Sequence, residues 1–433
     1  MNFKDLPPIK EQLMKCVRCG KCRSVCPVFA EVKNETAAPR GHVFIVQMLR
    51  DDKVEPDHKV YEKLSACLLC ENCTVNCPSG IDIHELNAAA RAYIYEKNPS
   101  LGKELVFDTL WTSPGLLKTS TMLMGGVQKL GLQKLARNIG LTKILPGDLS
   151  KAEKMLDSVP SRSARSQLPE VNKAKGEKKY TVGYFLGCGT DLLNPEVALA
   201  TVNVLTLNGC EVIIPRESKC CGLPHIANGK LETARRLAAH NIKIFNSYEF
   251  DYIITDCASC SSALSRKNME FLFKGLKIED TAYAFAEKVM DLTVFLVDVL
   301  KIEMDGDNLS EKRRVTYHDP CHLANAQGIK SQPRELLQRI PGIELVEMKN
   351  ANTCCGGSGT YSVTHYDMSM KILDKKMDNA METGADMIAT CCPSCMMQLR
   401  YGTQRHKWNC RVIHPVQLIN DFYLHKPAKT AGE

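Results

Sequence analysis

The chain has 433 residues, which is too long for one ordinary domain, and 44% of them are hydrophobic, which is enough to form more than one core. We therefore expect two or three domains. Its 56 Lys and Arg nearly balance 49 Asp and Glu, and no basic block alternates with aromatic residues, so we expect no nucleic-acid partner. The longest apolar stretches, such as 292–300, are shorter than the roughly 18 residues of a membrane-spanning helix, which excludes a transmembrane protein.

Cysteine is the unusual component of this composition. The sequence contains 21 cysteines, eight of them between Cys16 and Cys77 and thirteen from Cys188 onward. The start MNFKDLPPIK lacks the apolar segment of a secretory leader, so we expect a cytoplasmic protein with reduced thiols. Because disulfides are rare in that compartment, closely spaced cysteines are better explained as metal ligands.

Two cysteine motifs of the same form, C-x2-C-x2-C-x3-C-P, occupy the first part of the chain. In this pattern three thiolates converge on one cubane cluster and the fourth points toward the other cluster, so the ligand sets cross over. We therefore predict two [4Fe-4S] clusters, one held by Cys16, Cys19, Cys22 and Cys77 and the other by Cys67, Cys70, Cys73 and Cys26. A pair of zinc sites is the alternative, but zinc sites use cysteine pairs with longer spacers.

The surroundings of these motifs are basic and apolar. The first motif carries Lys15, Arg18, Lys21 and Arg23, which either form an ordinary solvated face or raise the potential of the nearby cluster. Residues 105–145 combine leucines and methionines with Lys118, Lys129, Lys134, Arg137 and Lys143 against one acid, Asp108. This helical stretch either packs over the first domain or lies on an anionic membrane surface. The polar run 161–179 has the composition of an exposed linker, and we place the main domain boundary there.

The remainder contains an internal repeat, in which the segment from Thr181 matches the segment from Val315. Each copy runs from a strand and a single cysteine, through a second strand, to a cysteine pair followed by glycine. A long helix, a third strand and a C-x-x-C complete each copy. The predicted strands are 181–185, 211–215 and 251–255, then 315–319, 344–348 and 386–390, and the predicted long helices are 231–245 and 366–381. Strands alternating with helices predict parallel α/β sheets, in which functional residues collect at the carboxyl ends of the strands.

Each copy supplies five cysteines at matching intervals. They are Cys188, Cys220, Cys221, Cys257 and Cys260 in the first copy and Cys321, Cys354, Cys355, Cys392 and Cys395 in the second. The flanking residues pair Cys392 with Cys257, which makes Cys391 the counterpart of Asp256. Because Cys210 and Cys410 have no partner at metal spacing, we expect them to be core thiols.

Three histidines accompany these cysteines. His318 and His322 flank Cys321, and His225 follows Cys221. Each either hydrogen-bonds a cluster sulfur, donates a proton to a substrate thiolate, or is satisfied by local partners. We assign no catalytic residue.

The arrangement C-x31-CC-x35-C-x-x-C, present twice, resembles the CCG domain pair of heterodisulfide reductase. A two-cluster ferredoxin domain followed by two CCG domains is the order of the heterodisulfide reductase D subunit and of the glycolate and lactate oxidase iron-sulfur subunits, so the resemblance covers the whole chain. The segments APRGHVFIVQML, ACLLCENCTVNCPSGIDIHEL, HDPCHLANAQG and CCGGSGTYSV favour the glycolate oxidase type, whereas the complete C-x-x-C of the second copy departs from it. The resemblance implies one or two noncubane [4Fe-4S] clusters at the CCG sites, with zinc as an alternative occupant of one of them.

We accordingly predict an α+β and α/β multidomain chain with a helical two-cluster ferredoxin domain and two repeated α/β CCG domains. The predicted domains are 1–105 (ferredoxin), 106–179 (helical segment and linker), 180–310 (first CCG) and 311–433 (second CCG).

The resemblance implies the electron-transfer subunit of a flavin-dependent 2-hydroxyacid oxidoreductase of the glycolate or D-lactate type. Because no G-x-G-x-x-G fingerprint opens a strand-helix turn, the FAD would belong to a partner subunit, and a quinone or other acceptor would take the electrons. Such a protein is cytoplasmic, either free or peripheral at the inner face of the membrane. The alternative is a thiol:disulfide reductase with a noncubane cluster. A non-enzymatic module with structural metals is disfavoured by the crossed motifs.

Overall fold

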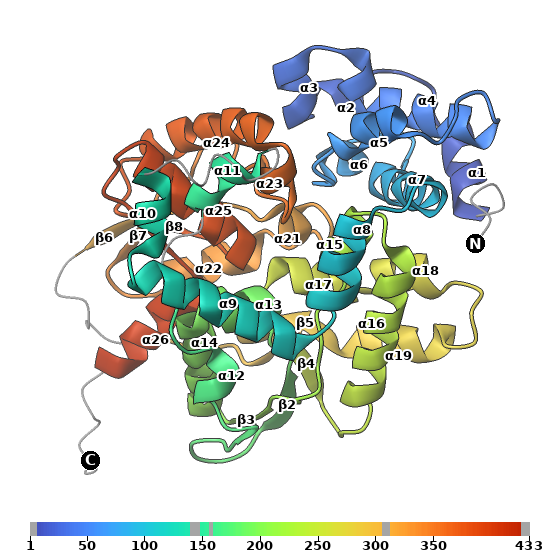
Figure 1. Cartoon of the computed structure of the whole chain (residues 1–433). Coiled ribbons are helices and arrows are strands. Elements are labelled where there is room, and N and C mark those ends of the chain that lie inside the picture. Colours follow the sequence, from blue (N-terminus) through green and yellow to red (C-terminus); the bar gives the residue numbers. More distant parts are fainter. Residues whose placement is uncertain (1–6, 139–147, 156–158, 305–311, 426–433) are drawn as a thin grey trace, which may run out of the picture.

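The computed structural model describes residues 7–138, 148–155, 159–304 and 312–425. Helices surround two separate sheets of parallel strands, and the helices of the N-terminal part lie together at one end of the molecule (Figure 1). The predicted mixture of a helical domain with two α/β repeats is confirmed. The domain limits remain predictions, and the one at 310 lies outside the described residues. Within the described ranges, no helix is both long and apolar enough to cross a bilayer.

The N-terminal part is helical. Its elements are α1 Pro7–Met14, α2 Lys21–Ser24, α3 Pro27–Val32, η2 Glu35–Ala37, α4 Pro39–Arg50, α5 His58–Ser65, α6 Asn72–Val75 and α7 Ile83–Lys97. Prolines open α3 and α4, where the missing N–H costs nothing. The Asp82 side chain accepts a hydrogen bond from the Glu85 N–H and so caps α7. These helices bury apolar faces of α1, α4 and α7 against one another.

The segment between the cysteine motifs and the repeat docks mainly on the first repeat. Its elements are α8 Leu101–Lys103, the π-helix η3 Glu104–Leu110, α9 Pro114–Lys129, α10 Leu132–Asn138, α11 Leu149–Ala152, η5 Glu153–Met155, α12 Ala164–Gln167 and β1 Val171–Asn172. The ammonium of Lys103 lies 3.7 Å from the ring centre of Tyr61, which joins α8 to the N-terminal helices. Beyond it, the Phe107 carbonyl contacts His225, and α9 contacts the helix that begins at Cys188. The described part of 105–145 therefore contacts mainly the first repeat, whereas the contacts with the N-terminal helices come from Lys103 and Glu104 just before it.

The polar run 161–179 is not a simple exposed linker. Ser163 and Ala164 are buried, and the Arg165 guanidinium donates to the Pro215 and Leu186 carbonyls at 3.0 and 3.1 Å. Strand β1 adds an antiparallel edge to the first sheet. The polar composition suggested solvent exposure, but backbone carbonyls of the first repeat satisfy the charged group instead.

The first repeat forms a sheet with strand order β1-β3-β2-β4-β5. Its elements are β2 Tyr180–Tyr184, α13 Cys188–Leu193, α14 Pro195–Leu207, β3 Cys210–Ile213, α15 Leu223–Ala227, α16 Leu231–Phe245, β4 Tyr252–Thr255, α17 Ala258–Leu264, α18 Arg266–Phe273, α19 Glu279–Lys288, β5 Val289–Asp291, α20 Leu292–Val294 and η6 Phe295–Val299. The three predicted strands and the long helix α16 are confirmed. Strand β5 was not predicted, because its three residues show no alternation of apolar and polar side chains.

The second repeat has the same sheet without the antiparallel edge, in the order β7-β6-β8-β9. Its elements are β6 Arg313–Tyr317, α21 Cys321–Ala324, α22 Ser331–Arg339, β7 Ile343–Leu345, α23 Tyr361–Thr364, α24 Tyr366–Met381, β8 Met387–Ala389, α25 Pro393–Arg405, β9 Arg411–Ile413 and α26 Pro415–His425. The three predicted strands and α24 are again confirmed, and β9 was not predicted. Each strand pairs in parallel with its neighbour.

The two repeats pack against each other in a reciprocal way. Helix α17 of the first contacts α21 of the second, and α13 of the first contacts α25 of the second. Because α13 corresponds to α21 and α17 to α25, this is the self-complementary pattern of a two-fold interface within one chain. The Ala258 N–H donates to the Cys391 carbonyl at 2.9 Å, so the two C-x-x-C loops meet at its centre.

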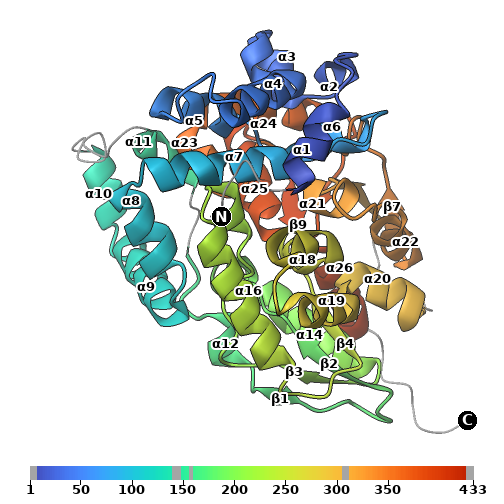
Figure 2. The ribbon, with the colours of Figure 1, turned by 90° about the vertical axis from the view of Figure 1, so that its right-hand side faces the viewer.

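Arg91 joins the N-terminal helices to the first repeat, above which they lie in Figure 2. Its side chain, 4% exposed, donates to the Leu64 and Cys67 carbonyls at 2.7 and 2.6 Å and to the Ala227 carbonyl at 2.7 Å. One guanidinium thus satisfies buried backbone groups from two domains.

We predict that Arg91→Met lowers the free energy of unfolding by about 3 kcal/mol, because the buried carbonyls lose their charged donor. Anaerobic urea denaturation followed by circular dichroism measures the change. The matched control is Arg162→Met at an exposed position, which should cost less than about 0.5 kcal/mol. Equal losses in the two variants would contradict the joining role of Arg91.

Candidate metal centres

Two cavities in the N-terminal part each contain one of the predicted crossed cysteine sets. The first is lined by Cys16, Cys19, Cys22 and Cys77, with Arg18 and Arg40 beside them. Cys19 is exposed, whereas the other three are half-buried. Lys15, Arg18 and Lys21 are exposed on this loop, and Arg23 forms an ion pair with Glu35 at 3.1 Å. This centre therefore lies close to a basic surface.

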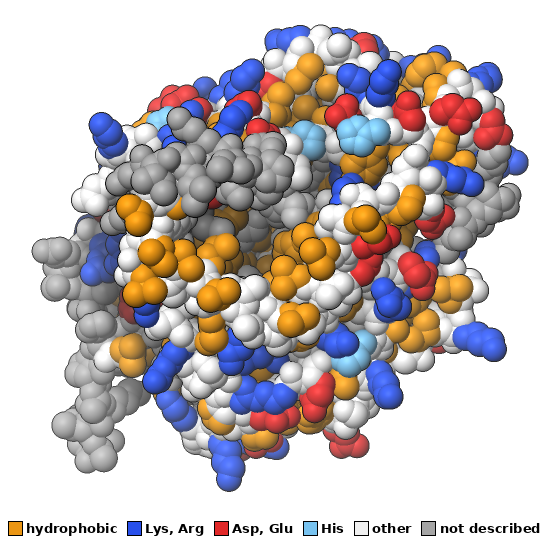
Figure 3. All heavy atoms as spheres, viewed as in Figure 1, with side chains coloured by type: hydrophobic (Ala, Val, Ile, Leu, Met, Phe, Trp, Pro, Cys, Tyr) orange, Lys and Arg blue, Asp and Glu red, His pale blue; other side chains and the backbone are white. Residues whose placement is uncertain are grey.

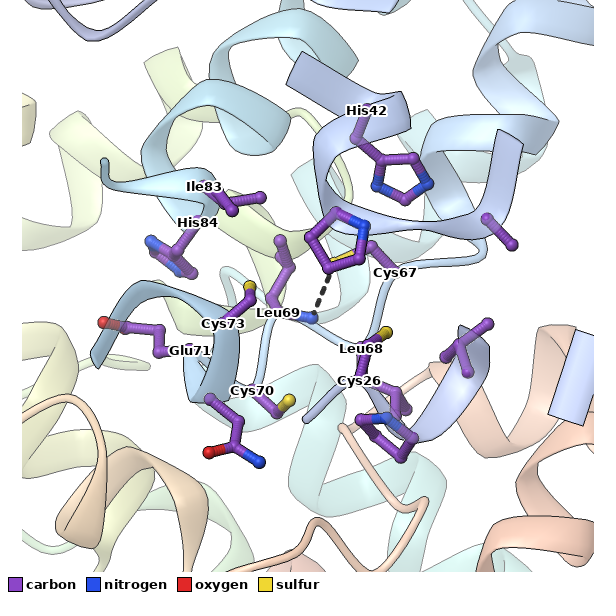
Figure 4. Close-up of a pocket in the computed structure, with 15 residues that line it drawn as sticks. Cys26, His42, Cys67, Leu68, Leu69, Cys70, Glu71, Cys73, Ile83 and His84 are labelled. Carbon is purple, nitrogen blue, oxygen red and sulfur yellow. Dashed lines mark hydrogen bonds between the residues drawn. The ribbon is translucent and has the colours of Figure 1, made fainter. Parts of the chain in front are cut away.

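The second cavity is deeper and contains the second crossed set. It is lined by Cys67, Cys70, Cys73 and Cys26, together with His42 and His84. Figure 4 shows the four sulfur atoms pointing toward a common space. Burial raises the pKa of Cys26 to about 12 and raises that of Cys73 well above its ordinary value. Buried thiols at such spacing become thiolates only when a positive group binds among them, and the geometry suits a metal cluster.

The two cysteine loops have the same backbone shape. Arg18 and Gly20 in the first loop, and Leu69 and Glu71 in the second, all have positive φ angles at corresponding positions. Non-glycine residues adopt this conformation only where the surroundings impose it, and such strain collects at functional loops. The turn lets cysteines three residues apart face the same side.

Polar residues that the sequence analysis missed support the second loop. Lys267 of α18 forms an ion pair with the buried Glu71 and another, at 2.7 Å, with Asp82. Asn87 contacts the ring of His42 at 3.3 Å behind the cavity. The sequence holds no signal for these pairs, because the partners are separated by 45 to 196 residues.

In the first repeat, the five predicted cysteines come together at the carboxyl ends of β2 and β4. Their thiols lie next to one another in the order Cys188, Cys220, Cys221, Cys260, Cys257. Hydrogen bonds from Cys220 and Cys260 hold the pKa of Cys221 well below its ordinary value. The glycine after the cysteine pair, Gly222, has a φ of 92°, which only glycine adopts freely in this tight turn.

The second repeat brings its five cysteines together in the same way. The thiols are in contact in the order Cys321, Cys354, Cys355, Cys395, Cys392. All five are buried. The pKa of Cys355 is again well below its ordinary value because Cys354 and Cys395 donate to it, and Gly356 has a φ of 85°.

The five cysteines of the first repeat and the five of the second meet at the interface between the repeats. The thiol of Cys257 in the first repeat lies beside that of Cys392 in the second, and the Ser259 hydroxyl lies 3.4 Å from the Cys392 sulfur. Ten thiols therefore form one continuous series from Cys188 to Cys321, which we call the cysteine row.

The predicted equivalence of Cys391 and Asp256 is confirmed, and both lie outside the row. The Tyr184 hydroxyl donates to the Asp256 carboxylate, which also accepts from Thr190 at 2.9 Å. In the second repeat the equivalent Tyr317 hydroxyl lies 3.5 Å from the Cys391 sulfur. Cys210, the first residue of β3, and Cys410, just before β9, are buried in the hydrophobic core, as expected.

The cysteine row ends beside the second N-terminal cavity. Cys70, Cys321 and Cys354 belong to one buried apolar cluster with Cys26 packed against it. The Asn325 amide donates to the Cys70 carbonyl at 2.9 Å, which holds the two loops together. The four cysteine sites therefore follow one another in space in the order first loop, second loop, second repeat, first repeat.

The three histidines differ in their surroundings. His225 contacts the Phe107 carbonyl at 2.8 Å, and the Nδ1 of His322 contacts the Ser259 hydroxyl at 3.3 Å, so both have local partners. His318 lies with Cys355 and Cys395 in a buried group whose ligand atoms are within 4.8 Å of one another.

Comparison with protein families finds matches along most of the chain. Residues 12–81 match the 4Fe-4S dicluster domain, and residues 182–265 and 315–400 each match the cysteine-rich CCG domain. Residues 98–156 match the linker region of the glycolate oxidase iron-sulfur subunit. These matches support iron-sulfur clusters in this chain.

Similar proteins span the same length. The chain is 34% identical over 423 residues to the probable glycolate oxidase iron-sulfur subunit of Bacillus subtilis, covering 96% of this chain and 95% of that protein. It is 28% identical to a subunit of the fumarate reductase (CoM/CoB) of Methanothermobacter marburgensis, over 95% of this chain and 73% of that protein. Lactate utilization protein A of an Exiguobacterium strain is 34% identical over 55% of this chain and 97% of its own length. This chain belongs to the glycolate oxidase iron-sulfur subunit family, with heterodisulfide reductase-like relatives.

Proposed function

We propose that this chain is the electron-transfer subunit of a flavin-dependent 2-hydroxyacid oxidoreductase of the glycolate or D-lactate type. It would take electrons from the FAD of a partner subunit and pass them to a quinone. The observation that carries the proposal is the spatial series of four cysteine sites, which runs from the exposed Cys19 through the protein interior to Cys188. Iron-sulfur clusters at these sites would supply single-electron steps.

The first cysteine loop suits an entry point. Cys19 is exposed, and Arg18 and Lys21 beside it are exposed cations. An electron-donating subunit with an acidic surface would be steered to this end of the molecule, because opposite charges raise association rates. We place the flavin subunit there.

The other end of the series suits an exit. The thiol of Cys188 contacts the indole of Trp111, which stacks on Phe107 at a ring-centre distance of 5.6 Å. Both aromatic residues lie where η3 leads into α9. An acceptor bound near α9 would therefore be close to the last cysteine site.

The surface around α9 is apolar and basic. It exposes Leu116, Leu123, Met124, Leu130, Leu132 and Leu135. Figure 3 shows hydrophobic side chains gathered over the region where α8–α10 lie in Figure 1. Lys118 and Lys129 belong to α9, and the sequence contains no acid between Asp108 and Asp148. Lys143, which was predicted to belong to the same basic stretch, lies outside the described residues. Exposed leucines with cations suit an anionic lipid surface, where a quinone would be available, although the Glu153 carboxylate contacts Gln133 at the edge of this surface.

One observation favours disulfide reduction as a second candidate. The cysteine groups of the two repeats meet at Cys257 and Cys392 inside the protein, and a disulfide bound there would face both. The same series of sites would carry electrons to this disulfide. The substrate would then bind between Cys257 and Cys392, and no acceptor would be needed near Cys188.

We predict that Cys70→Ser interrupts the series. In the anaerobically purified chain with its flavin subunit and glycolate or D-lactate, reduction of the C-terminal sites should slow at least about 100-fold, because the centre between donor and row is lost. Stopped-flow visible absorbance and EPR measure the rates. Iron analysis of the unmodified chain should find about eight atoms per chain if only the N-terminal clusters form and about sixteen if both repeats also hold clusters.

The control is Cys391→Ser, a buried thiol outside the row, which should leave the rates within about twofold. Reduction that is unchanged by Cys70→Ser would contradict the proposed route. If a thiol pair reduces the clusters, a disulfide re-oxidises them and no 2-hydroxyacid has any effect, the result would favour disulfide reduction as the function.

We predict that the double substitution Leu123→Glu with Leu130→Glu abolishes binding to vesicles that contain anionic lipid. Each leucine contributes about 1.5–3 kcal/mol when buried, so the loss of both should lower the affinity more than about 100-fold. Co-sedimentation with anionic and with zwitterionic vesicles measures it. Leu276→Glu, at another exposed leucine, is the matched control and should bind as the unmodified chain does. No binding by the unmodified chain would exclude the membrane role of α9.

A further inference from the structure

His318 differs from the other buried histidines near the cysteine row. It lies between β6 and α21 and is fully buried. Neither ring nitrogen has a hydrogen-bond partner among the described residues apart from the sulfur of Cys355. A buried imidazole without polar partners is costly, because its donor and acceptor have lost water. Something that the protein chain alone does not supply is therefore expected to bind it.

The ring faces two members of the row. The ligand atoms of His318, Cys355 and Cys395 lie within 4.8 Å of one another, and all three side chains are buried. Of all His, Cys, Asp and Glu side chains in the described ranges, only these three form so compact a group. The thiols of Cys354 and Cys392 each lie beside one of these two thiols, so further thiolates are within reach.

The first repeat has no such donor. Alignment of Cys188 with Cys321 places Phe185 opposite His318. Phe185 is also fully buried, but its ring lies 5.6 Å from that of Phe245 within an apolar cluster that includes Cys257 and Cys260. The same fold position therefore presents hydrocarbon to one cysteine group and nitrogen to the other.

We propose that His318 is a metal ligand, and that with Cys355 and Cys395 it makes the second repeat a mixed imidazole-thiolate centre while the first repeat is an all-thiolate centre. Imidazole and thiolate together bind either zinc or an iron of an iron-sulfur centre. This inference rests on metal occupancy of the second repeat, which is part of the proposed function, but it does not depend on the flavin partner or on the 2-hydroxyacid.

The assignment has a consequence for electron transfer. A neutral imidazole in place of an anionic thiolate leaves an iron-sulfur centre less negative and raises its potential. If the second repeat holds iron, its potential lies above that of an all-thiolate centre of the same type. If it holds zinc, the second repeat carries no electron, and the series of sites is joined only through the thiolates at Cys392 and Cys257.

The test is metal spectroscopy of the full chain, purified without oxygen and labelled with ¹⁵N-histidine. X-ray absorption at the iron and zinc edges separates nitrogen from sulfur ligands, at about 2.0–2.1 Å and about 2.3 Å for zinc. Pulsed EPR detects ¹⁵N bound to iron. We expect one directly coordinated histidine nitrogen, which His318→Phe removes together with about four iron atoms or about one zinc ion per chain.

Two further variants keep the result interpretable. His318→Cys retains a metal-binding side chain, so it should retain the metal but lose the nitrogen signal, even if His318→Phe fails to fold. The control is His322→Phe, because His322 is a neighbouring histidine that already contacts Ser259. This variant should keep both the metal and the nitrogen signal. A nitrogen signal that persists in His318→Cys, or its absence from the unmodified chain, would overturn the assignment. Failure of the flavin-driven reduction with the nitrogen signal intact would reject the proposed function alone.

Discussion

Burying many thiols in contact with one another is the constraint on which this structure depends. A buried thiol resists ionisation, as the raised pKa of Cys70 shows, since burial is its main cause. Clustered thiolates would also repel each other in a medium of low polarity. A bound cation removes both costs, because it neutralises the charges and takes up the lone pairs. The dense cysteine sites are therefore understandable as the protein's half of a metal assembly.

The fold supplies this convergence by repetition. Each sheet directs its cysteines to the carboxyl ends of its strands, and helices begin at Cys188 and Cys321 there. The reciprocal packing of the repeats then makes the two groups meet. The N-terminal helices are held over the row by contacts such as the hydrogen bond from Ser358 to the Leu68 carbonyl. One chain thereby brings four sites into series without a second subunit.

The repetition is not complete, and the differences have chemical meaning. Asp256 and Cys391 occupy equivalent positions, yet one accepts hydrogen bonds from several hydroxyl groups and the other is a nearly isolated thiol beside Tyr317. Phe185 and His318 differ more, because hydrocarbon cannot bind a metal and imidazole can. Two copies of one fold can therefore hold centres of different composition.

The sequence by itself determined the features that depend on local spacing. The repeated strands, helices such as α16 and the equivalence of Cys391 with Asp256 follow from intervals along the chain, and the structure agrees with each. The crossed cysteine sets follow from spacing in the same way and line two cavities, and their role as ligand sets stays a prediction. Only the tertiary structure decided the spatial order of the sites, the meeting of Cys257 with Cys392, the docking of Arg165 against the first sheet and the isolation of His318. These features depend on contacts between segments far apart in sequence. Composition and periodicity carry no record of such contacts, because they arise only when the separate cores pack together.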